Sequence, residues 1–317
     1  MALHEVSFWT HYPHPLVLSL SAVILVLALI FLLCYFAVLK TLFNKTLFEN
    51  NTFYFILKNI CILDMIFLLG TLMAAFISLT NKTAFPLFYE LVSAIHACYE
   101  WTLHLFCLSL ACKVFAVIFT LEFKYTNKIL KVFTLCVWKA LIILLHLNHA
   151  FEINLVFIHD IINFAVNLPT SKAERGFNIM FYIDLGVLLI TLFLYILIFC
   201  FLLFQKVILM ERNSIETCDM FILYIGLATY LPAATYFLIN SALGAYLDKA
   251  SLAVSLFLNI LFRLIPVCNL VGLLAVNNEL RRIFVAGLKR RFCKCKSSPG
   301  KKETIQNSAP NEVEACL

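Results

Sequence analysis

A few ionisable side chains stand inside long apolar runs of this sequence. They are Asp64, Glu100, His104, Asp184 and Arg263. A charge at the centre of a bilayer costs at least about 2.5 kcal/mol, so such residues face a partner or a cavity rather than lipid. Carboxylates accept hydrogen bonds, and a guanidinium presents a fork of donors that suits a carboxylate or phosphate. We therefore expect these residues to pair with one another or to bind a small polar molecule.

The spacing of some of these residues indicates which kind of site they could form. His96, Glu100 and His104 recur every four residues and form one stripe on a helix face. Only neighbours in such a stripe can reach the same ion, so it favours a polar pocket lining over a metal site. Arg263 stands about 9 Å along a helix from Asn269. It is predicted to form an ion pair with Glu100 or Asp184, to contact the ligand, or to do both in different states. With no HExxH motif, we expect neither a metal nor an enzyme.

The composition predicts the helices that carry these residues. The 317 residues are 63% hydrophobic and only 13% charged, whereas a soluble domain carries about 25% charge. An all-α, seven-transmembrane bundle is therefore predicted, at about 20 residues per span. The expected spans are 16–39, 55–79, 94–121, 132–147, 177–204, 220–240 and 251–276. The expected regions are an extracellular N-terminus (1–15), the bundle (16–276), a basic amphipathic helix (277–296) and a disordered tail (297–317).

Basic residues predict the orientation. Sixteen Lys and Arg residues fall on the side that would be cytoplasmic if the N-terminus is outside, against four on the other side. Cytoplasmic loops carry the excess of Lys and Arg, so the N-terminus is expected to be extracellular. On that side the sequon Asn81-Lys82-Thr83 makes Asn81 a candidate glycosylation site.

The segment after the seventh span is amphipathic. Leu280, Ile283 and Phe284 recur at helical spacing, with Arg281 and Arg282 between them. This pattern predicts a short helix lying in the membrane interface, its basic side toward anionic lipids rather than nucleic acid. At the far end of that helix, Cys293 and Cys295 are candidates for palmitoylation.

Several positions resemble rhodopsin-like G-protein-coupled receptors. Asn269 and the stretch Asn277–Phe284 are similar to the end of the seventh helix and to helix 8 of that family. The segment from Asn59 to Asp64 resembles the second-helix pattern, and Trp138 matches the lone tryptophan of the fourth helix. Tyr230-Leu231-Pro232 resembles the Trp-x-Pro of the sixth helix. These matches occur in four helices and in the family's order.

The resemblance implies a receptor in the plasma membrane that binds a small external ligand and activates a heterotrimeric G protein. Three groups of residues carry these roles. The expected ligand pocket is Glu100, His104, Asp184, Tyr230 and Arg263. The expected polar switch is Asp64, Asn269 and Pro232, with a sodium ion beside Asp64. The expected G-protein-facing residues are Glu122, Lys124, Arg281 and Arg282.

The sequence also departs from the family pattern. Leu270 and Leu273 replace the Pro and Tyr of the seventh helix, and Glu122-Phe123-Lys124 lacks the arginine of the third. Residues 149–176 contain no cysteine for the family's disulfide bridge. Such loose retention resembles the divergent serpentine chemoreceptors of nematodes. The alternative is a polytopic transporter or ligand-gated channel, which needs a polar pathway across the whole bilayer.

Overall fold

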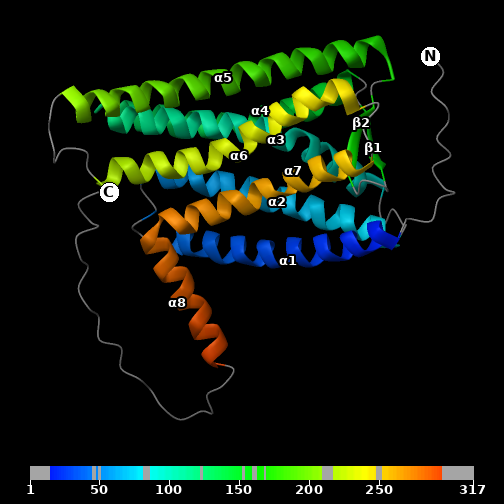
Figure 1. Cartoon of the computed structure of the whole chain (residues 1–317), viewed down its shortest axis with the longest axis horizontal. Helices are drawn as coiled ribbons and strands as arrows, with labels where there is room; N and C mark the ends of the chain where they lie inside the picture. Colours follow the sequence, from blue (N-terminus) through cyan, green and yellow to red (C-terminus); the bar gives the residue numbers. More distant parts are fainter. Residues whose placement is uncertain are drawn as a thin grey trace.

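The computed structural model describes residues 15–44, 48, 51–80, 86–121, 124–151, 154–158, 163–167, 169–208, 217–247 and 252–294. These residues form a helical bundle with an eighth, shorter helix, so the predicted fold class is confirmed (Figure 1). The helices are α1 (Pro15–Asn44), α2 (Thr52–Thr80), α3 (Pro86–Ile118), α4 (Lys124–Ala150), α5 (Ser171–Ile208), α6 (Thr217–Leu247), α7 (Leu252–Val276) and α8 (Asn278–Lys294). Seven of them, α1 to α7, are long and apolar enough to cross a membrane, as a multi-pass membrane protein requires.

Most helices extend beyond the predicted apolar spans. α4, for example, begins at Lys124 although the apolar window begins at residue 132. Hydropathy marks only the part of a helix that suits hydrocarbon, whereas backbone hydrogen bonding continues into the polar ends. α3 falls short of its predicted span at one end, because it stops at Ile118 and not at the predicted residue 121. There Thr120 adopts φ 53° and Leu121 N donates to Ala116 O at 2.8 Å, which closes the helix.

The connection between α4 and α5 contains a β-hairpin that the sequence analysis did not predict. Its strands, β1 (Asn154–Ile158) and β2 (Asn163–Asn167), pair antiparallel with Asn154 opposite Asn167. The hairpin packs against α3. We call this end of the bundle the hairpin end, and the opposite end, from which α8 leaves at a steep angle, the α8 end (Figure 1).

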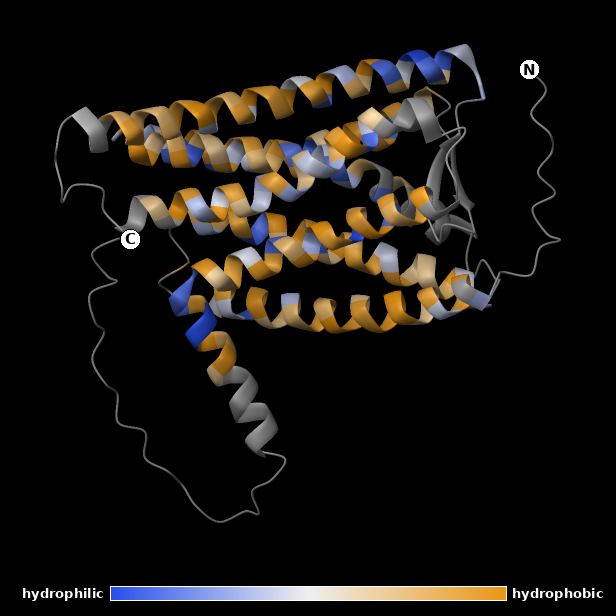
Figure 2. Cartoon of the chain, in the orientation of Figure 1, coloured by the Kyte–Doolittle hydropathy of each residue, from blue (hydrophilic) through white to orange (hydrophobic). Residues whose placement is uncertain are grey.

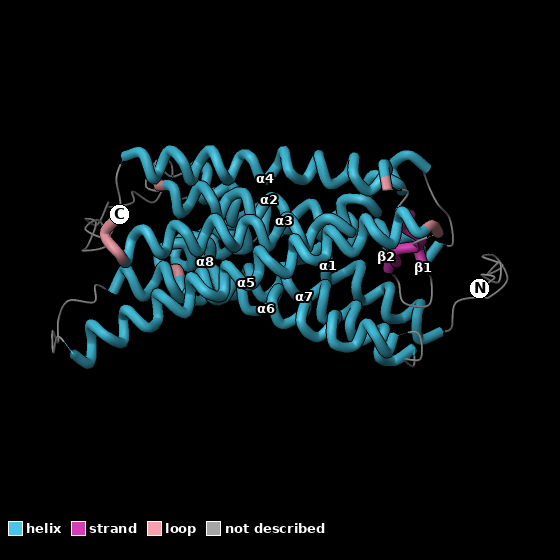
Figure 3. The backbone as a smooth tube through the Cα atoms, turned by 90° about the horizontal axis from the view of Figure 1, so that it is seen from above, coloured by secondary structure: helices cyan, strands magenta, loops and turns pink. Residues whose placement is uncertain are grey.

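α3 is the central helix. It packs against α2, α4, α5 and α6, while α1 pairs with α2 and α6 pairs with α7. The view from above shows these helices running side by side along the length of the bundle (Figure 3). α3 can therefore present different side chains to different neighbouring helices at one level.

The outer faces of the bundle are apolar. Large hydrophobic side chains are exposed along α1 and α5, among them Val26, Leu33, Phe193 and Phe199. Coloured by hydropathy, the helices are mostly hydrophobic along their length, and hydrophilic residues gather at the start of α5 and at the α7–α8 junction (Figure 2). An apolar belt with polar ends is the surface that a bilayer stabilises.

Asn277 forms the junction between α7 and α8. Its Oδ1 accepts a hydrogen bond from Leu280 N at 2.9 Å and so caps α8. Its Nδ2 donates to the Tyr54 hydroxyl of α2 at 3.1 Å. α8 also packs against α1, with Leu280 fully buried. The first turn of α8 is therefore part of the bundle rather than a loose appendage.

Candidate functional site

The first buried polar group, which we call the Asp64 cluster, consists of Tyr35, Asp64, Tyr99 and Asn269. The Tyr35 hydroxyl donates to Asp64 Oδ2 at 2.6 Å, and the Tyr99 hydroxyl donates to Asp64 Oδ1 at 2.6 Å. Asn269 Nδ2 lies 3.1 Å from Oδ2 and 3.4 Å from Oδ1. Asp64, Tyr35 and Tyr99 are all completely buried. The cluster joins α1, α2, α3 and α7, and it brings together the predicted partners Asp64 and Asn269.

Tyr35 and Tyr99 were missed by the sequence analysis. The Tyr35 hydroxyl also lies 2.6 Å from the carbonyl oxygen of Pro266, within α7. A tyrosine inside an apolar span is a weak signal, because most such rings simply pack against neighbours. Each hydroxyl nevertheless needed a buried acceptor, and Asp64 was an available one. Pro266 is a second proline inside a helix, in addition to the predicted Pro232.

The contacts of the Asp64 carboxylate bear on the sodium ion that the resemblance suggested. An ionised carboxylate offers about four lone-pair positions. Here Oδ1 is contacted by Tyr99 and Asn269, and Oδ2 by Tyr35 and Asn269. Two tyrosine hydroxyls and an amide thus stabilise the charge of Asp64. Asn269 Oδ1, however, is buried without a hydrogen-bond partner among the described residues, so the sodium ion stays a prediction.

A second pair of positions that resemble the receptor family also meets in space. Trp138 Nε1 of α4 donates to Asn59 Oδ1 of α2 at 2.7 Å. Asn59 Nδ2 in turn donates to Phe55 O at 2.7 Å within α2. Both polar ends of the Asn59 amide are thus satisfied, and α2 is bonded to α4.

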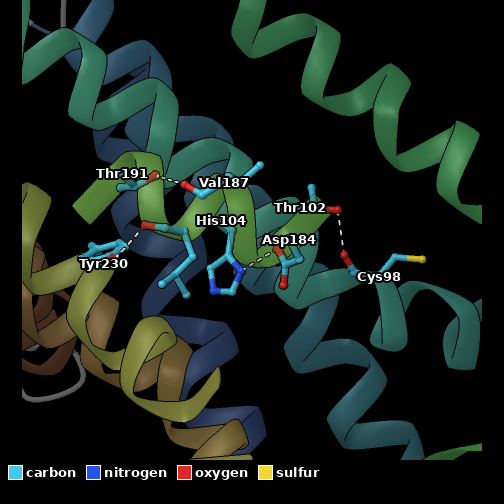
Figure 4. Close-up of polar contacts among 8 residues, drawn as sticks. Cys98, Thr102, His104, Asp184, Val187, Thr191 and Tyr230 are labelled. Carbon is cyan, nitrogen blue, oxygen red and sulfur yellow. Dashed lines mark hydrogen bonds and ion pairs between the residues drawn. The ribbon is translucent and has the colours of Figure 1, made fainter. Parts of the chain in front are cut away.

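The second buried polar group, the His104 cluster, lies on the side of α3 that faces α5. It consists of Glu100 and His104 of α3 and Asp184 of α5. His104 Nδ1 and Asp184 Oδ1 are 2.8 Å apart (Figure 4), and the two side chains are 1% and 3% exposed. Glu100 precedes His104 by one helical turn and interacts electrostatically with both. The structure therefore brings three of the predicted pocket residues together.

Several polar atoms of the His104 cluster lack hydrogen bonds. Glu100 Oε1, His104 Nε2 and Asp184 Oδ2 are buried and have no hydrogen-bond partner among the described residues. Buried polar groups in proteins are usually satisfied, so each exception calls for an explanation. Three exceptions in one cluster mark it as the strongest candidate for ligand binding.

Arg263 is hydrogen-bonded within its own helix. Its Nε donates to Asn259 Oδ1, one turn earlier on α7, at 2.9 Å, and the side chain is 7% exposed. Asp184, one of the two expected partners, is bonded to His104 instead. The position of these side chains around their helix axes decided the pairing, and the sequence carries little information about it.

Tyr230 lies on the α6 side of the same region. Its hydroxyl donates to Leu188 O of α5 at 3.1 Å (Figure 4), and the residue is 2% exposed. Its ring lies 5.4 Å from that of Tyr195. Pro232 follows within α6. Tyr230 thus fastens α6 to α5 one turn beyond Asp184, and its hydroxyl is engaged with the backbone rather than open to a ligand.

The remaining predicted residues, for G-protein contact, glycosylation and palmitoylation, are only partly described. Arg281 is exposed and donates to Ala275 O at 2.9 Å, and Arg282 lies 3.3 Å from Glu279 Oε2. Glu122, Asn81 and Cys295 lie outside the described residues. Lys124 begins α4 and Cys293 lies in α8, but their side chains are outside the described part.

A cluster of aromatic rings extends from Tyr99 of the Asp64 cluster to α6 and α7. Phe67 of α2 stacks on Tyr99 of α3 at 4.0 Å and on His96 at 4.4 Å between ring centroids. Phe262 of α7 meets Phe67 edge-on at 4.9 Å and stacks on Tyr236 of α6 at 4.7 Å. His96 is therefore packed among aromatic rings, one face of its ring against Phe67.

Within the part of the chain that the structure describes, no three His, Cys, Asp or Glu side chains are arranged to hold a metal ion. No protein-family model matches the sequence, and no curated protein matches it either. The geometry of the two clusters therefore carries the functional argument.

Proposed function

We propose that this chain is a rhodopsin-like G-protein-coupled receptor, of a divergent chemosensory kind, that senses a small external ligand. One observation supports the proposal above the others. Three matches recognised separately by resemblance, in α2, α4 and α7, pair in space as Asn59–Trp138 and Asp64–Asn269. Chance similarities along a hydrophobic sequence have no reason to become buried hydrogen-bond partners.

The two clusters suggest how ligand binding would act. Tyr99 and Glu100 are adjacent on α3 and point about 100° apart around its axis. Tyr99 bonds to Asp64, and Glu100 belongs to the His104 cluster. A ligand that moves α3 relative to α5 would therefore strain the Tyr99–Asp64 bond at the same time. The rings of Phe262 and Tyr236 would carry the change to α6 and α7.

The receptor would lie in the plasma membrane with its N-terminus outside, as the basic residues favour. The α8 end would then face the cytoplasm, and the heterotrimeric G protein would meet Glu122, Lys124, Arg281 and Arg282. α8 would lie against lipid headgroups, with palmitate on Cys293 or Cys295 as a second anchor. Asn81 would carry a glycan on the outer side.

A functional screen tests this proposal. The full chain is expressed in cells and challenged with pools of small metabolites while cAMP, calcium and membrane current are recorded. We expect a cAMP or calcium response that disappears in cells lacking G-protein α subunits. The variant Trp138→Phe, matched for surface level, should weaken the response because Asn59 loses its donor. Currents that persist without G proteins would instead favour the ligand-gated channel, and substrate accumulation would favour the transporter.

A further inference from the structure

The two open carboxylate oxygens of the His104 cluster are both acceptors. Asp184 Oδ1 accepts from His104 Nδ1 in their 2.8 Å contact. Glu100 Oε1 and Asp184 Oδ2 have no hydrogen-bond partner among the described residues. The cluster therefore lacks hydrogen-bond donors at two buried carboxylate oxygens.

The charge of the His104 cluster also favours a ligand that donates hydrogen bonds. Two carboxylates, from α3 and α5, lie beside a single imidazole that can carry at most one positive charge. Burying a carboxylate is costly unless a positive group and hydrogen bonds compensate it. His104 bonds to one oxygen of Asp184, which leaves Glu100 Oε1 and Asp184 Oδ2 uncompensated. A cation that also donates hydrogen bonds would remove both deficits.

The geometry favours an organic cation over a metal ion. The two ring nitrogens of His104 point in nearly opposite directions, and Nε2 faces away from Asp184 (Figure 4). The three side chains accordingly do not form one of the arrangements that hold a metal ion. Aromatic rings adjoin the cluster, because Phe237 meets the His104 ring edge-on at 5.7 Å and Phe181 stacks on Phe237 at 5.4 Å. Such rings attract the alkyl body of an ammonium compound and its charge.

We propose that Glu100 and Asp184 form a binding site for a primary ammonium group, with His104 holding Asp184 in position through its 2.8 Å contact. An ammonium group has three donors and no acceptor, which complements a site of acceptors. This inference rests on the proposed receptor function and names the ligand class of that receptor.

Thermal unfolding of the purified full chain in nanodiscs tests the site without a known ligand. The probes are primary amines of increasing size, from methylamine through 2-phenylethylamine to tryptamine. Each amine is compared with the alcohol and the carboxylate of the same carbon skeleton. At a concentration well above its Kd, at least one amine should raise the unfolding midpoint by about 5 °C. The matching alcohol and carboxylate should raise it much less.

Charge-neutralising variants locate the effect. Glu100→Gln and Asp184→Asn keep the shape of each side chain and should weaken the binding of that amine about 10- to 100-fold. Glu174→Gln is the matched control, because Glu174 is an exposed glutamate in the first turn of α5. It should bind the amine as the wild type does. Equal affinity in Glu100→Gln and Asp184→Asn would refute the site.

If a variant does not fold, measurements on the wild type alone still test the proposal. The proposal is wrong if no amine in the series shifts the midpoint, or if the alcohol or carboxylate shifts it as much. Binding that depends on Glu100 and Asp184, without any G-protein response in cells, would keep the site and refute the receptor. G-protein responses to uncharged or anionic ligands that both variants preserve would keep the receptor and refute the site.

Discussion

The two polar clusters lie on different sides of α3 and differ in how far their hydrogen bonds are satisfied. In the Asp64 cluster, two tyrosines and Asn269 direct donors at both oxygens of one carboxylate. In the His104 cluster, two carboxylates share one imidazole, and one oxygen of each carboxylate has no partner among the described residues. The Asp64 cluster also has an open atom, Asn269 Oδ1, but both oxygens of its carboxylate are hydrogen-bonded. A carboxylate whose oxygens are satisfied stabilises the fold, whereas an unsatisfied one costs stability until a ligand completes it. This difference favours a structural role for Asp64 and a binding role for Glu100 and Asp184.

The largest effect on stability is expected from removing the carboxylate of the Asp64 cluster. Asp64→Ala leaves the hydroxyls of Tyr35 and Tyr99 and the amide of Asn269 without their buried acceptor. Each unsatisfied donor costs about 1–3 kcal/mol, so the free energy of unfolding should fall by at least about 3 kcal/mol. Unfolding in detergent, monitored by tryptophan fluorescence, measures the loss. If Asp64→Ala were as stable as the wild type, the cluster would not be a structural centre.

A single hydroxyl gives the next largest effect. Tyr35→Phe removes the group that contacts both Asp64 and the Pro266 carbonyl, and we expect a loss of about 1–3 kcal/mol. Tyr195→Phe is the matched control, because the buried Tyr195 hydroxyl has no hydrogen-bond partner among the described residues. Removing that hydroxyl should leave stability unchanged or slightly raised. Equal costs for both variants would contradict the assignment of these contacts.

The packing around Asn269 is tested by Gly272, one turn further along α7. A Cβ at Gly272 would lie 2.7 Å from the Ala228 Cβ of α6. Gly272→Ala should therefore push α6 from α7 and cost about 1–2 kcal/mol, since overpacking outweighs the gain in helix propensity. Adding Ala228→Gly should restore stability. Gly186→Ala, with open space at its Cβ, should be neutral or slightly stabilising; a loss there as large as at Gly272 would point to backbone effects alone.

The smallest effect on stability is expected for a substitution in the His104 cluster. Glu100→Gln replaces a buried carboxylate that is not paired through Oε1. In the absence of amine, its free energy of unfolding should match that of the wild type to within about 0.5 kcal/mol, or exceed it, because an uncompensated charge is removed. The same unfolding assay compares it with Asp64→Asn, which should be clearly destabilised. A large loss in Glu100→Gln would mean that Glu100 has a structural partner.

The candidate site was predictable in part. Glu100, His104 and Asp184 could be named because an ionisable residue inside an apolar span always needs a partner or a cavity. Their pairing could not, and the prediction that Asp184 or Glu100 holds Arg263 did not anticipate the bonds of Asp184 to His104 and of Arg263 to Asn259. Tyr35 and Tyr99 gave no signal, since a tyrosine becomes a polar residue only when its hydroxyl meets an acceptor.

The sequence by itself determined the number of membrane-crossing helices, the separate α8 and the presence of buried charges. These are local properties: the bilayer sets a length of about 20 apolar residues, and a window of that length can be read directly. Tertiary structure alone decided which helices share each polar residue and built the β1–β2 hairpin against α3. Those outcomes depend on the rotation and depth of each helix relative to its neighbours. Adjacent residues such as Tyr99 and Glu100 consequently belong to two clusters with opposite hydrogen-bonding states.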